Sequence, residues 1–467
     1  MENRSISKAT RINLLLAGDL TILLFSLWLT LLIRYGQKFD YSLWQSHLAP
    51  FVVVIIFLLI VFYIEDLYEL GTSKGRVHLL NRILQSLLIG CAFAFAFFYI
   101  GIDRLFTIKP QRVFLIYVII AGILIYFWRL WFYKVARSPR IADGIIFIGY
   151  NKKVGEIIRQ IQKRPELGFQ VRAIIPVANG ETEIIPAEYE GLVTSVGLDQ
   201  LKATCQQKEI QTIITTIHPR EDKSLMKNLF ECLALKIKFY ELTKFYENIT
   251  GKIPVTTIEQ IWFLENLTER DKRTYGLFKR IIDIIVSIIA LTISLPFIPL
   301  IAFAIKTTSK GPAFFKQIRT GKDGKNFLAI KFRTMVANAE TNGPQWASKN
   351  DPRVTAVGRF FRKTRIDEIP QLINILRGEM SLIGPRPERP EFIEQLQNQI
   401  PFYRERLMVK PGLTGWAQVM GPAYGGSLEE TLEKIQFDLY YIKNRSIALD
   451  LSILLKTVRT VLTRKGQ

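Results

Sequence analysis

The sequence is poor in the residues that usually bind metals or form disulfides, with three cysteines and three histidines among 467 residues. Cys91, Cys205 and Cys232 follow no metal-ligand spacing, so we expect reduced thiols and no disulfide framework. The histidines are equally scattered, which argues against a histidine metal site and against a Ser-His-Asp triad. Any metal would therefore be a hard cation with oxygen ligands.

Acidic residues are also scarce, because 62 Lys and Arg residues face 41 Asp and Glu residues and leave a net charge of +21. Such an excess is typical of proteins that bind nucleic acid, anionic lipid or phosphorylated substrates. The chain is at the same time 49% hydrophobic. This combination favours a membrane protein that handles phosphorylated substrates and argues against nucleic acid as a partner.

Four long apolar stretches near the N-terminus predict four transmembrane helices of about 20 residues each. They run from Leu14 to Ile33, Leu48 to Ile64, Ile83 to Ile102 and Val113 to Tyr133. Within them, we expect Asp19 to face a helix neighbour and Arg129 to extend to the membrane surface. Basic residues number nine at the two ends and in the middle loop, against five in the other two loops. The positive-inside rule then places both ends of the bundle, and everything after residue 140, in the cytoplasm.

From Gly144 onward, the pattern alternates between strands and helices and predicts a small doubly wound α/β domain. The expected strands run from Gly144 to Gly149, Phe169 to Ile175, Gln211 to Ile217 and Lys236 to Tyr240, and the expected helices from Lys152 to Lys163 and Asp222 to Leu235. The first turn, Gly149 to Gly155, lies where a dinucleotide loop would, yet it lacks the middle glycine that admits a pyrophosphate. A structural or regulatory Rossmann-like domain is thus favoured over a nucleotide-binding one.

A fifth apolar segment, Ile284 to Ile305, carries no charge and is long enough to span a bilayer. Basic residues at both of its ends favour the same cytoplasmic face, however, and Ser294 and Pro296 interrupt its middle. We therefore expect a re-entrant helix that enters the membrane, breaks at Ser294 and Pro296, and returns.

The most informative feature is a pair of adjacent carboxylates, Asp367 and Glu368, among basic residues. Pro370 and the apolar positions after it predict a helix that begins next to the pair and stops at Gly378. Carboxylates there can cap the helix or compensate its dipole, and the same helix end attracts phosphate. Neighbouring residues do not point the same way, so a nucleophile with a metal ligand fits the pair better than a shared-proton dyad.

Basic residues on both sides of the pair are suited to phosphate. Lys331 and Arg333 alternate within an apolar strand, so we expect them to share one sheet face and converge on phosphate. Arg386 lies in the turn Gly384 to Pro387, a rigid mount for a contact with phosphate or uracil, with an ordinary surface turn as the alternative.

The stretch from Lys279 to Leu462 closely resembles the catalytic part of the bacterial sugar transferases, the polyprenyl-phosphate hexose-1-phosphate transferases. Besides the carboxylate pair, the resemblance rests on Gly311 to Gln317, Lys331 to Met335, Gly384 to Pro387, Val409 to Gln418 and Asp438 to Ile442. It implies a re-entrant helix, Asp367 as nucleophile, Glu368 as a Mg²⁺-binding or acid-base partner, and Arg362 as a phosphate contact. Arg365 departs from the small hydroxyl residue that many relatives carry there.

We therefore expect an α/β membrane protein in three parts: four transmembrane helices over 1–139, a Rossmann-like cytosolic domain over 140–265, and an α/β catalytic domain over 266–467 with its re-entrant helix at about 281–305. The resemblance implies a multi-pass inner-membrane enzyme with a cytosolic catalytic domain. It would move hexose 1-phosphate from a UDP-hexose to undecaprenyl phosphate with Mg²⁺, release UMP, and initiate exopolysaccharide, capsule or O-antigen synthesis. Asp367, Glu368 and Asp438 are candidate metal ligands, and Gln418 is a candidate substrate contact.

Two alternatives stay open. The lipid could attack the UDP-sugar directly while Asp367 only binds metal, or the chain could be a non-catalytic membrane scaffold that recruits later glycosyltransferases. UDP-sugar, undecaprenyl phosphate and anionic lipid are the expected partners. The sequence identifies neither the hexose nor the role of the Rossmann-like domain, and it leaves a homo-oligomer open.

Overall fold

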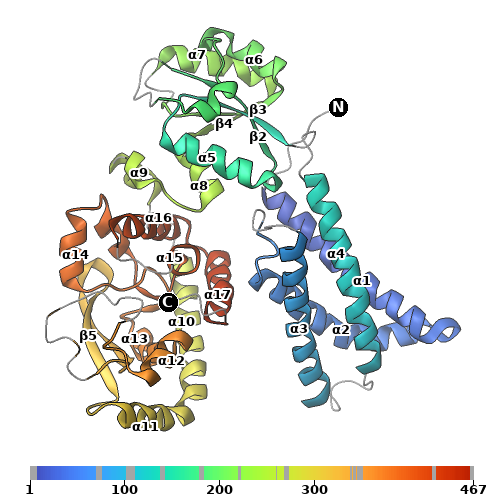
Figure 1. Cartoon of the computed structure of the whole chain (residues 1–467), viewed down its shortest axis with the longest axis vertical. Helices are drawn as coiled ribbons and strands as arrows, with labels where there is room; N and C mark the ends of the chain where they lie inside the picture. The colour runs from blue at the N-terminus through green and yellow to red at the C-terminus, as the bar shows by residue number, and fades with distance from the viewer. Residues whose placement is uncertain are drawn as a thin grey trace. The chain divides into compact units, whose positions relative to one another are not determined.

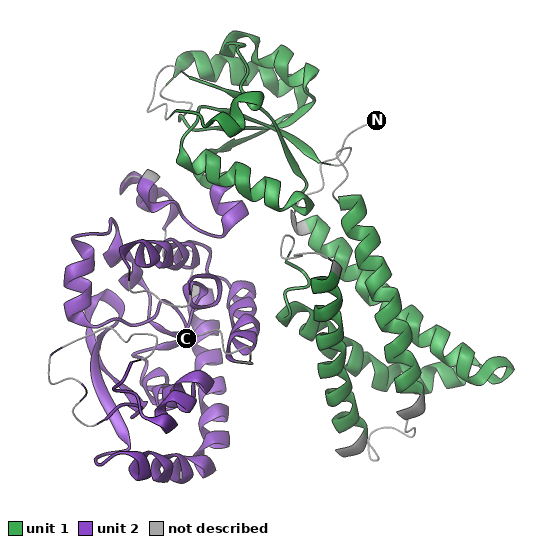
Figure 2. Ribbon diagram, in the orientation of Figure 1, with its two compact units in different colours: residues 1–245 green, residues 246–467 purple. Residues whose placement is uncertain are grey.

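The structure is a computed structural model of the whole chain. It describes residues 8–69, 76–100, 111–136, 142–177, 184–218, 222–258, 260–267, 273–336, 339, 343, 351–422 and 427–462. The chain divides into two compact units, Met1–Phe245 and Tyr246–Gln467, which Figure 2 colours separately.

The first unit begins with four long helices, α1 (Lys8–Tyr35), α2 (Tyr41–Ile64), α3 (Arg76–Ile100) and α4 (Gln111–Ala136). Each is long and apolar enough to cross a membrane, which confirms the predicted apolar helices. Large apolar side chains such as Ile33, Leu88 and Ile119 are exposed, as expected where a surface faces lipid. Several of the basic residues on which the predicted membrane orientation rests, including Arg4 and Lys74, lie outside the described residues.

Arg129 of α4 lies inside the bundle, fully buried, and forms an ion pair with the equally buried Asp19 of α1. Its guanidinium also donates to the Leu67 carbonyl and lies 5.0 Å from the centre of the Tyr68 ring. A charge in an apolar interior is costly unless it is paired, so this ion pair fixes α1 against α4. Asp19 faces a helix neighbour as predicted, whereas the prediction that Arg129 extends outward is wrong because Asp19 holds it inside.

The α/β part of the first unit is a four-stranded parallel sheet with the order β2-β1-β3-β4. The strands are β1 (Asp143–Ile148), β2 (Phe169–Ile175), β3 (Ile210–Thr215) and β4 (Lys238–Glu241). α5 (Lys152–Lys163) covers one face, and α6 (Leu201–Gln207) and α7 (Lys223–Cys232) cover the other (Figure 1). This parallel sheet confirms the predicted doubly wound pattern, because a right-handed crossover through a helix is the usual route between parallel strands.

The boundary between the two compact units lies between Phe245 and Tyr246, earlier in the chain than the expected boundary between residues 265 and 266. The reason is the segment after α8 (Leu242–Thr250), in which Ile253, Val255 and Ile258 are buried in the hydrophobic core of the second unit. α9 (Gln260–Asn266) follows them and packs Trp262 and Phe263 against the same core. Apolar residues that follow a predicted strand and helix thus belong to the next unit.

The second unit carries the predicted motifs on short elements. β5 (Phe314–Thr320) and β6 (Asn326–Phe332) form an antiparallel hairpin across the predicted turn, and β7 (Ser381–Ile383) pairs in parallel with β8 (Gly412–Thr414). The helices are α12 (Ala356–Thr364), α13 (Gln371–Arg377), α14 (Pro390–Gln397), α15 (Trp416–Met420), α16 (Leu428–Asn444) and α17 (Ile447–Leu462). Residues of α13, α14, α16 and α17 share one hydrophobic core with β7.

The fifth apolar segment consists of two helices, α10 (Arg273–Ser294) and α11 (Ile298–Thr308), separated by a 3-10 turn at Leu295–Phe297. The two helices run in different directions from this break (Figure 1). Both contact the same unit, because Arg280 of α10 donates to the carbonyls of Ile375 and Leu376, while Ile301 and Ile305 of α11 lie in a core cluster with Phe332.

Candidate functional site

The carboxylate pair lies in a short turn between two helices of the second unit. α12 ends at Thr364, and Arg365 then adopts a left-handed backbone conformation with φ of 58°. The 3-10 turn Ile366–Glu368 follows and leads into α13. This reversal directs both carboxylates inward, where Asp367 is 6% and Glu368 5% exposed. The N-cap positions of the turn and of α13 are Arg365 and Pro370, so helix capping does not explain the pair.

Glu368 holds a cluster of cations around a single oxygen. Its Oε1 accepts hydrogen bonds from Arg386 Nη2 at 2.7 Å and from Lys331 Nζ at 3.2 Å, and Arg365 Nη1 lies 3.5 Å away. Burial alone would raise the pKa of this carboxyl, but the charges of Arg386, Lys331 and Arg365 outweigh it and hold the pKa of Glu368 well below its ordinary value. Glu368 is therefore ionised at neutral pH and gathers three cations from separate segments of the chain.

Asp367, its neighbour, has a very different environment. Its Oδ1 is buried and has no hydrogen-bond partner among the residues that the structure describes. Burial, and next the negative charge of Glu368, raise the pKa of Asp367 to about 6. Buried polar atoms are normally hydrogen-bonded, so an anionic oxygen left free beside a cation cluster is a candidate nucleophile or metal ligand.

Lys331 reaches the pair because β6 is fixed against α13 by one asparagine. Asn374 of α13 is fully buried, and its Oδ1 accepts a hydrogen bond from the Ile330 amide at 3.1 Å while its Nδ2 donates to the Leu328 carbonyl at 2.8 Å. Asn374 was not predicted from the sequence as a residue of the site. A polar residue within a run of apolar helix positions was the available signal, since such a residue is buried only when it is hydrogen-bonded.

Two further predicted arginines lie near the pair. Arg386 extends from the turn after β7 and keeps 37% of its side chain exposed while it bonds Glu368, so its guanidinium can also meet a ligand. Arg362, in the last turn of α12, donates from Nε to Thr334 Oγ1 at 2.9 Å. Burial lowers the pKa of Arg362, and the charge of Asp367 acts in the opposite direction. Together with Arg365, which the sequence showed only as a departure from the family pattern, these residues give the site its positive charge.

Arg333 does not join Lys331 as the sequence analysis expected. β6 ends at Phe332, and the Arg333 amide still donates to the Ala313 carbonyl at 2.9 Å, but the guanidinium is held elsewhere. Its Nη1 and Nη2 donate instead to the carbonyls of Lys310 and Ser309, at 3.1 and 2.8 Å. Arg333 therefore caps the chain where it leaves α11, and this is a structural role close to the membrane segment.

The structure also places Asp438 and Gln418 apart from the pair. Asp438 of α16 is 2% exposed and forms an ion pair with Arg406, Oδ2 to Nη2 at 3.0 Å. Burial raises the pKa of Asp438 to about 6 although Arg406 opposes the rise. Gln418 donates to the nearby Leu413 carbonyl at 3.1 Å. Asp438 Oδ2 accepts no hydrogen bond beyond this ion pair, and Gln418 Oε1 has no hydrogen-bond partner among the described residues. Neither side chain contacts the carboxylate pair among the described residues.

The oxygen atoms around the pair are the candidate ligands for the expected Mg²⁺. Among the described residues, no group of three or more His, Cys, Asp or Glu side chains converges to hold a metal ion. Mg²⁺ needs fewer protein ligands than that, because it is commonly bound by one or two carboxylates together with water and substrate phosphates. The free Oδ1 of Asp367 is a suitable ligand, whereas Glu368 Oε1 is already occupied by cations. A Mg²⁺ at this site would be held by Asp367 and would supply positive charge to a bound phosphate.

The arrangement suits chemistry at phosphorus. A carboxylate oxygen that attacks a phosphate needs its own charge available and the negative charge of the target neutralised. Asp367 meets the first condition, and Lys331, Arg362 and Arg386 meet the second.

Comparison with known proteins agrees with this geometry. The sequence profile of the family described as bacterial sugar transferase matches residues 274–464. The chain is 42% identical over 238 residues to the UDP-N-acetylgalactosamine-undecaprenyl-phosphate N-acetylgalactosaminephosphotransferase of Aeromonas hydrophila, which covers 51% of this chain and 55% of that protein. It is 36% identical over 334 residues to the UDP-glucose:undecaprenyl-phosphate glucose-1-phosphate transferase of Klebsiella pneumoniae, which covers 67% of this chain and 68% of that protein.

A third relative, the undecaprenyl-phosphate galactose phosphotransferase of Salmonella typhimurium, is 40% identical over 210 residues, 42% of each chain. The chain thus spans about half the length of the Aeromonas relative and about two thirds of the Klebsiella one. The Klebsiella match is longer than the matched family profile and therefore includes residues outside it. On this evidence the chain belongs to the bacterial sugar transferase family.

Proposed function

We propose that this chain transfers a sugar 1-phosphate from a UDP-sugar to undecaprenyl phosphate, releases UMP, and so initiates the assembly of a surface polysaccharide. The observation that carries the proposal is the buried Asp367 Oδ1, which has no described partner and lies beside cations gathered by Glu368. The donors and acceptor in the names of the relatives are UDP-sugars and undecaprenyl phosphate, which supports the same reaction.

In the first proposed step, Asp367 attacks the phosphorus that carries the sugar. A carboxylate oxygen forms a bond to this phosphorus, the bond from phosphorus to the bridging oxygen breaks, and UMP leaves with the electron pair. Lys331, Arg362 and Arg386 stabilise the phosphate charge that develops as UMP departs. A bound Mg²⁺ would neutralise further phosphate charge. Glu368 does not react but holds Lys331 and Arg386 in place.

In the second step, an oxygen of the lipid phosphate attacks the same phosphorus. The bond from Asp367 to phosphorus breaks, the carboxylate is regenerated, and the product is undecaprenyl diphosphosugar. Both steps take place at the same phosphorus beside one cation cluster, with Asp367 as the nucleophile in the first and the leaving group in the second, so the donor and the acceptor can occupy the same phosphate site in turn.

The proposed membrane arrangement brings the lipid phosphate to this cytosolic site. α10 and α11 contact the same unit on either side of their break, which supports a segment that returns to the face from which it entered. Ile289, Ile293, Leu300 and Phe303 on these helices are more than half exposed, as an inserted surface requires. A re-entrant α10–α11 therefore enters and leaves from the cytoplasmic face, with its break at Ser294 and Pro296.

The proposal is tested by UMP release from a panel of UDP-sugars with purified protein, undecaprenyl phosphate and Mg²⁺. Lipid-dependent UMP release with one donor, lost in Asp367→Asn, is the expected result and names the sugar. A non-catalytic scaffold would release no UMP from any donor while remaining folded. The panel is needed because the relatives act on different sugars by name, N-acetylgalactosamine, glucose and galactose.

A further inference from the structure

The turn that carries Arg386 is held at four consecutive carbonyl oxygens, those of Pro385 to Glu388. Pro385 O accepts a hydrogen bond from the Gly412 amide at 2.9 Å and Glu388 O from the Thr320 amide at 2.9 Å. The two carbonyls between them accept from side chains, Arg386 O from Arg406 Nη2 at 3.0 Å and Pro387 O from Arg319 Nη1 at 3.2 Å. The prolines on either side of Arg386 also fix their own φ angles, so very little freedom is left to this backbone.

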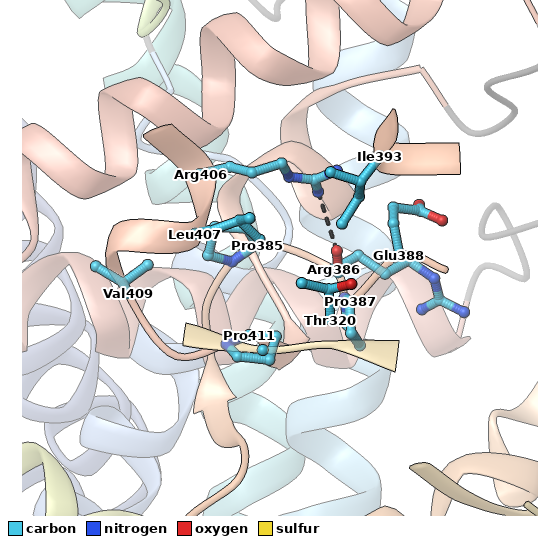
Figure 3. Close-up of a pocket in the computed structure, with 11 residues that line it drawn as sticks. Thr320, Pro385, Arg386, Pro387, Glu388, Ile393, Arg406, Leu407, Val409 and Pro411 are labelled. Atoms are coloured by element: carbon cyan, nitrogen blue, oxygen red, sulfur yellow. Dashed lines mark hydrogen bonds between the residues drawn. The ribbon is translucent and has the colours of Figure 1, made fainter. Parts of the chain in front are cut away.

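Arg406 is the more buried of the two arginine donors. It lies in the 3-10 segment Tyr403–Met408 and is 8% exposed. Its Nη1 donates to the Tyr403 hydroxyl at 2.7 Å, and its Nη2 forms the ion pair with Asp438. Figure 3 shows the guanidinium extending to the backbone of Arg386, with the hydrogen bond to its carbonyl dashed. Burying an arginine costs desolvation energy even when a counterion is present. The presence of such an arginine next to a site residue therefore suggests a specific role.

We propose that Arg406 is a positioning residue, which with Asp438 as its counterion fixes the Arg386 backbone so that the Arg386 guanidinium meets Glu368 and the substrate phosphate. This inference rests on the proposed function. The side chain of Arg386 is partly exposed and long, so its direction depends on where its backbone lies. The planar guanidinium of Arg406 bonds the Tyr403 hydroxyl through Nη1 while Nη2 meets both the Arg386 carbonyl and Asp438, and a single lysine ammonium lacks this geometry.

The same inference gives Asp438 a role other than that of a metal ligand. As the counterion of Arg406, Asp438 acts on the site only through the Arg386 turn. Its replacement should then leave the Mg²⁺ concentration for half-maximal activity unchanged. A metal ligand would behave differently, because its loss raises that concentration directly.

The experiment is a double-mutant cycle on the full-length protein, with Arg386→Ala, Arg406→Met and the two combined. If Arg406 acts through Arg386, Arg406→Met lowers kcat/KM by about 100-fold, as small misplacements of a charge clamp do, and has little further effect in the Arg386→Ala background. Arg406→Lys should restore only part of the loss. Full additivity of the two substitutions would overturn the proposal.

A second variant, Arg406→Met/Asp438→Leu, distinguishes loss of positioning from misfolding, because it removes the ion pair without leaving a buried charge. This variant should unfold at a temperature close to that of the wild type and still have the low kcat/KM. Hydrogen exchange of the peptide over residues 381–389 should be faster in it, and this readout needs no turnover. Unchanged exchange in this peptide would refute the positioning role, while absence of UMP release by the wild type would refute the proposed function instead.

Discussion

Asp367 and Glu368 are adjacent in the chain and similarly buried, yet Glu368 Oε1 is contacted by three cations while Asp367 Oδ1 has no described partner. The 3-10 turn directs the two side chains to different surroundings, and their pKa values shift in opposite directions. Two carboxylates whose pKa values are separated in this way have separate tasks. In the proposed mechanism, Glu368 organises the cations and Asp367 reacts.

Replacement of Asp367 should lower the activity and raise the stability of the folded protein. Asp367→Asn is expected to lower UMP release by about 1,000-fold or more. Because the pKa of Asp367 rises from 3.8 to about 6 on folding, ionisation at pH 8 disfavours the folded state, and its removal should stabilise the protein by about 1 to 3 kcal/mol.

This stabilisation should shrink as pH falls from 7 to 4, because the folded wild type then takes up the proton. Thermal unfolding of both proteins across that range checks the sign. Glu368→Gln is the matched control and should be destabilised instead, since its carboxylate is stabilised by cations. A lower unfolding temperature for Asp367→Asn than for the wild type at pH 8 would contradict the claim that its surroundings disfavour the ionised carboxylate.

The pH dependence of kcat/KM should report the ionisation of Asp367. The attacking oxygen must be unprotonated, so activity should rise with pH through an apparent pKa near 6 and level off above it. Asp438 has a similar pKa, so Asp438→Asn is the control, and the acid limb should persist in this variant at lower absolute activity. Loss of the acid limb in Asp438→Asn would show that the limb reports the ionisation of Asp438 and not that of Asp367.

Lys331 and Arg333 offer a matched pair of cations with different roles. Lys331→Met should reduce kcat/KM by about 100-fold, as the loss of one donor to a developing charge does. Arg333→Met leaves the Ser309 and Lys310 carbonyls unbonded and should cost about 1 to 3 kcal/mol of stability, with a much smaller effect on kcat/KM. Steady-state kinetics and thermal unfolding of both variants measure this, and equal catalytic losses would count against the separation of roles.

The re-entrant arrangement predicts the side from which the β5–β6 turn is reached. In a protein whose native cysteines are replaced, Lys322→Cys should react with a membrane-impermeant maleimide in inverted vesicles and not in intact cells. Gln37→Cys, in the turn between α1 and α2, should show the reverse pattern because it lies after one span. Labelling of Lys322→Cys in intact cells would indicate that the α10–α11 segment crosses the membrane.

Much of the fold follows from local sequence patterns. The apolar runs, the alternation of β1, α5 and β2, and the turn between β5 and β6 were all predictable, because each depends on periodicity or turn residues within a short window. The end of the middle domain was placed differently, since Ile253 and Val255 have the same apolar character whichever core they enter.

The site was predictable where residues act from short motifs and not where contacts span the chain. Asp367, Glu368, Lys331 and Arg386 lie in motifs and do meet in space. Arg406 was missed because its partners, the Arg386 carbonyl and Asp438, are distant in sequence, and no pattern of spacing reveals a side chain that bonds a remote backbone. Arg333 was misplaced because the Ser309 and Lys310 carbonyls that hold its guanidinium are distant in sequence.

The most direct test of the account is to trap the covalent intermediate. The wild type, incubated with Mg²⁺ and its UDP-sugar labelled in the sugar-linked phosphate but without lipid, should release up to one equivalent of UMP and retain a phosphosugar. Mass spectrometry should locate this group on Asp367, and addition of undecaprenyl phosphate should transfer it to the lipid. The contrary result is turnover with lipid present, but neither UMP release nor labelled protein when lipid is absent. That result would contradict the two-step account and support direct attack by the lipid.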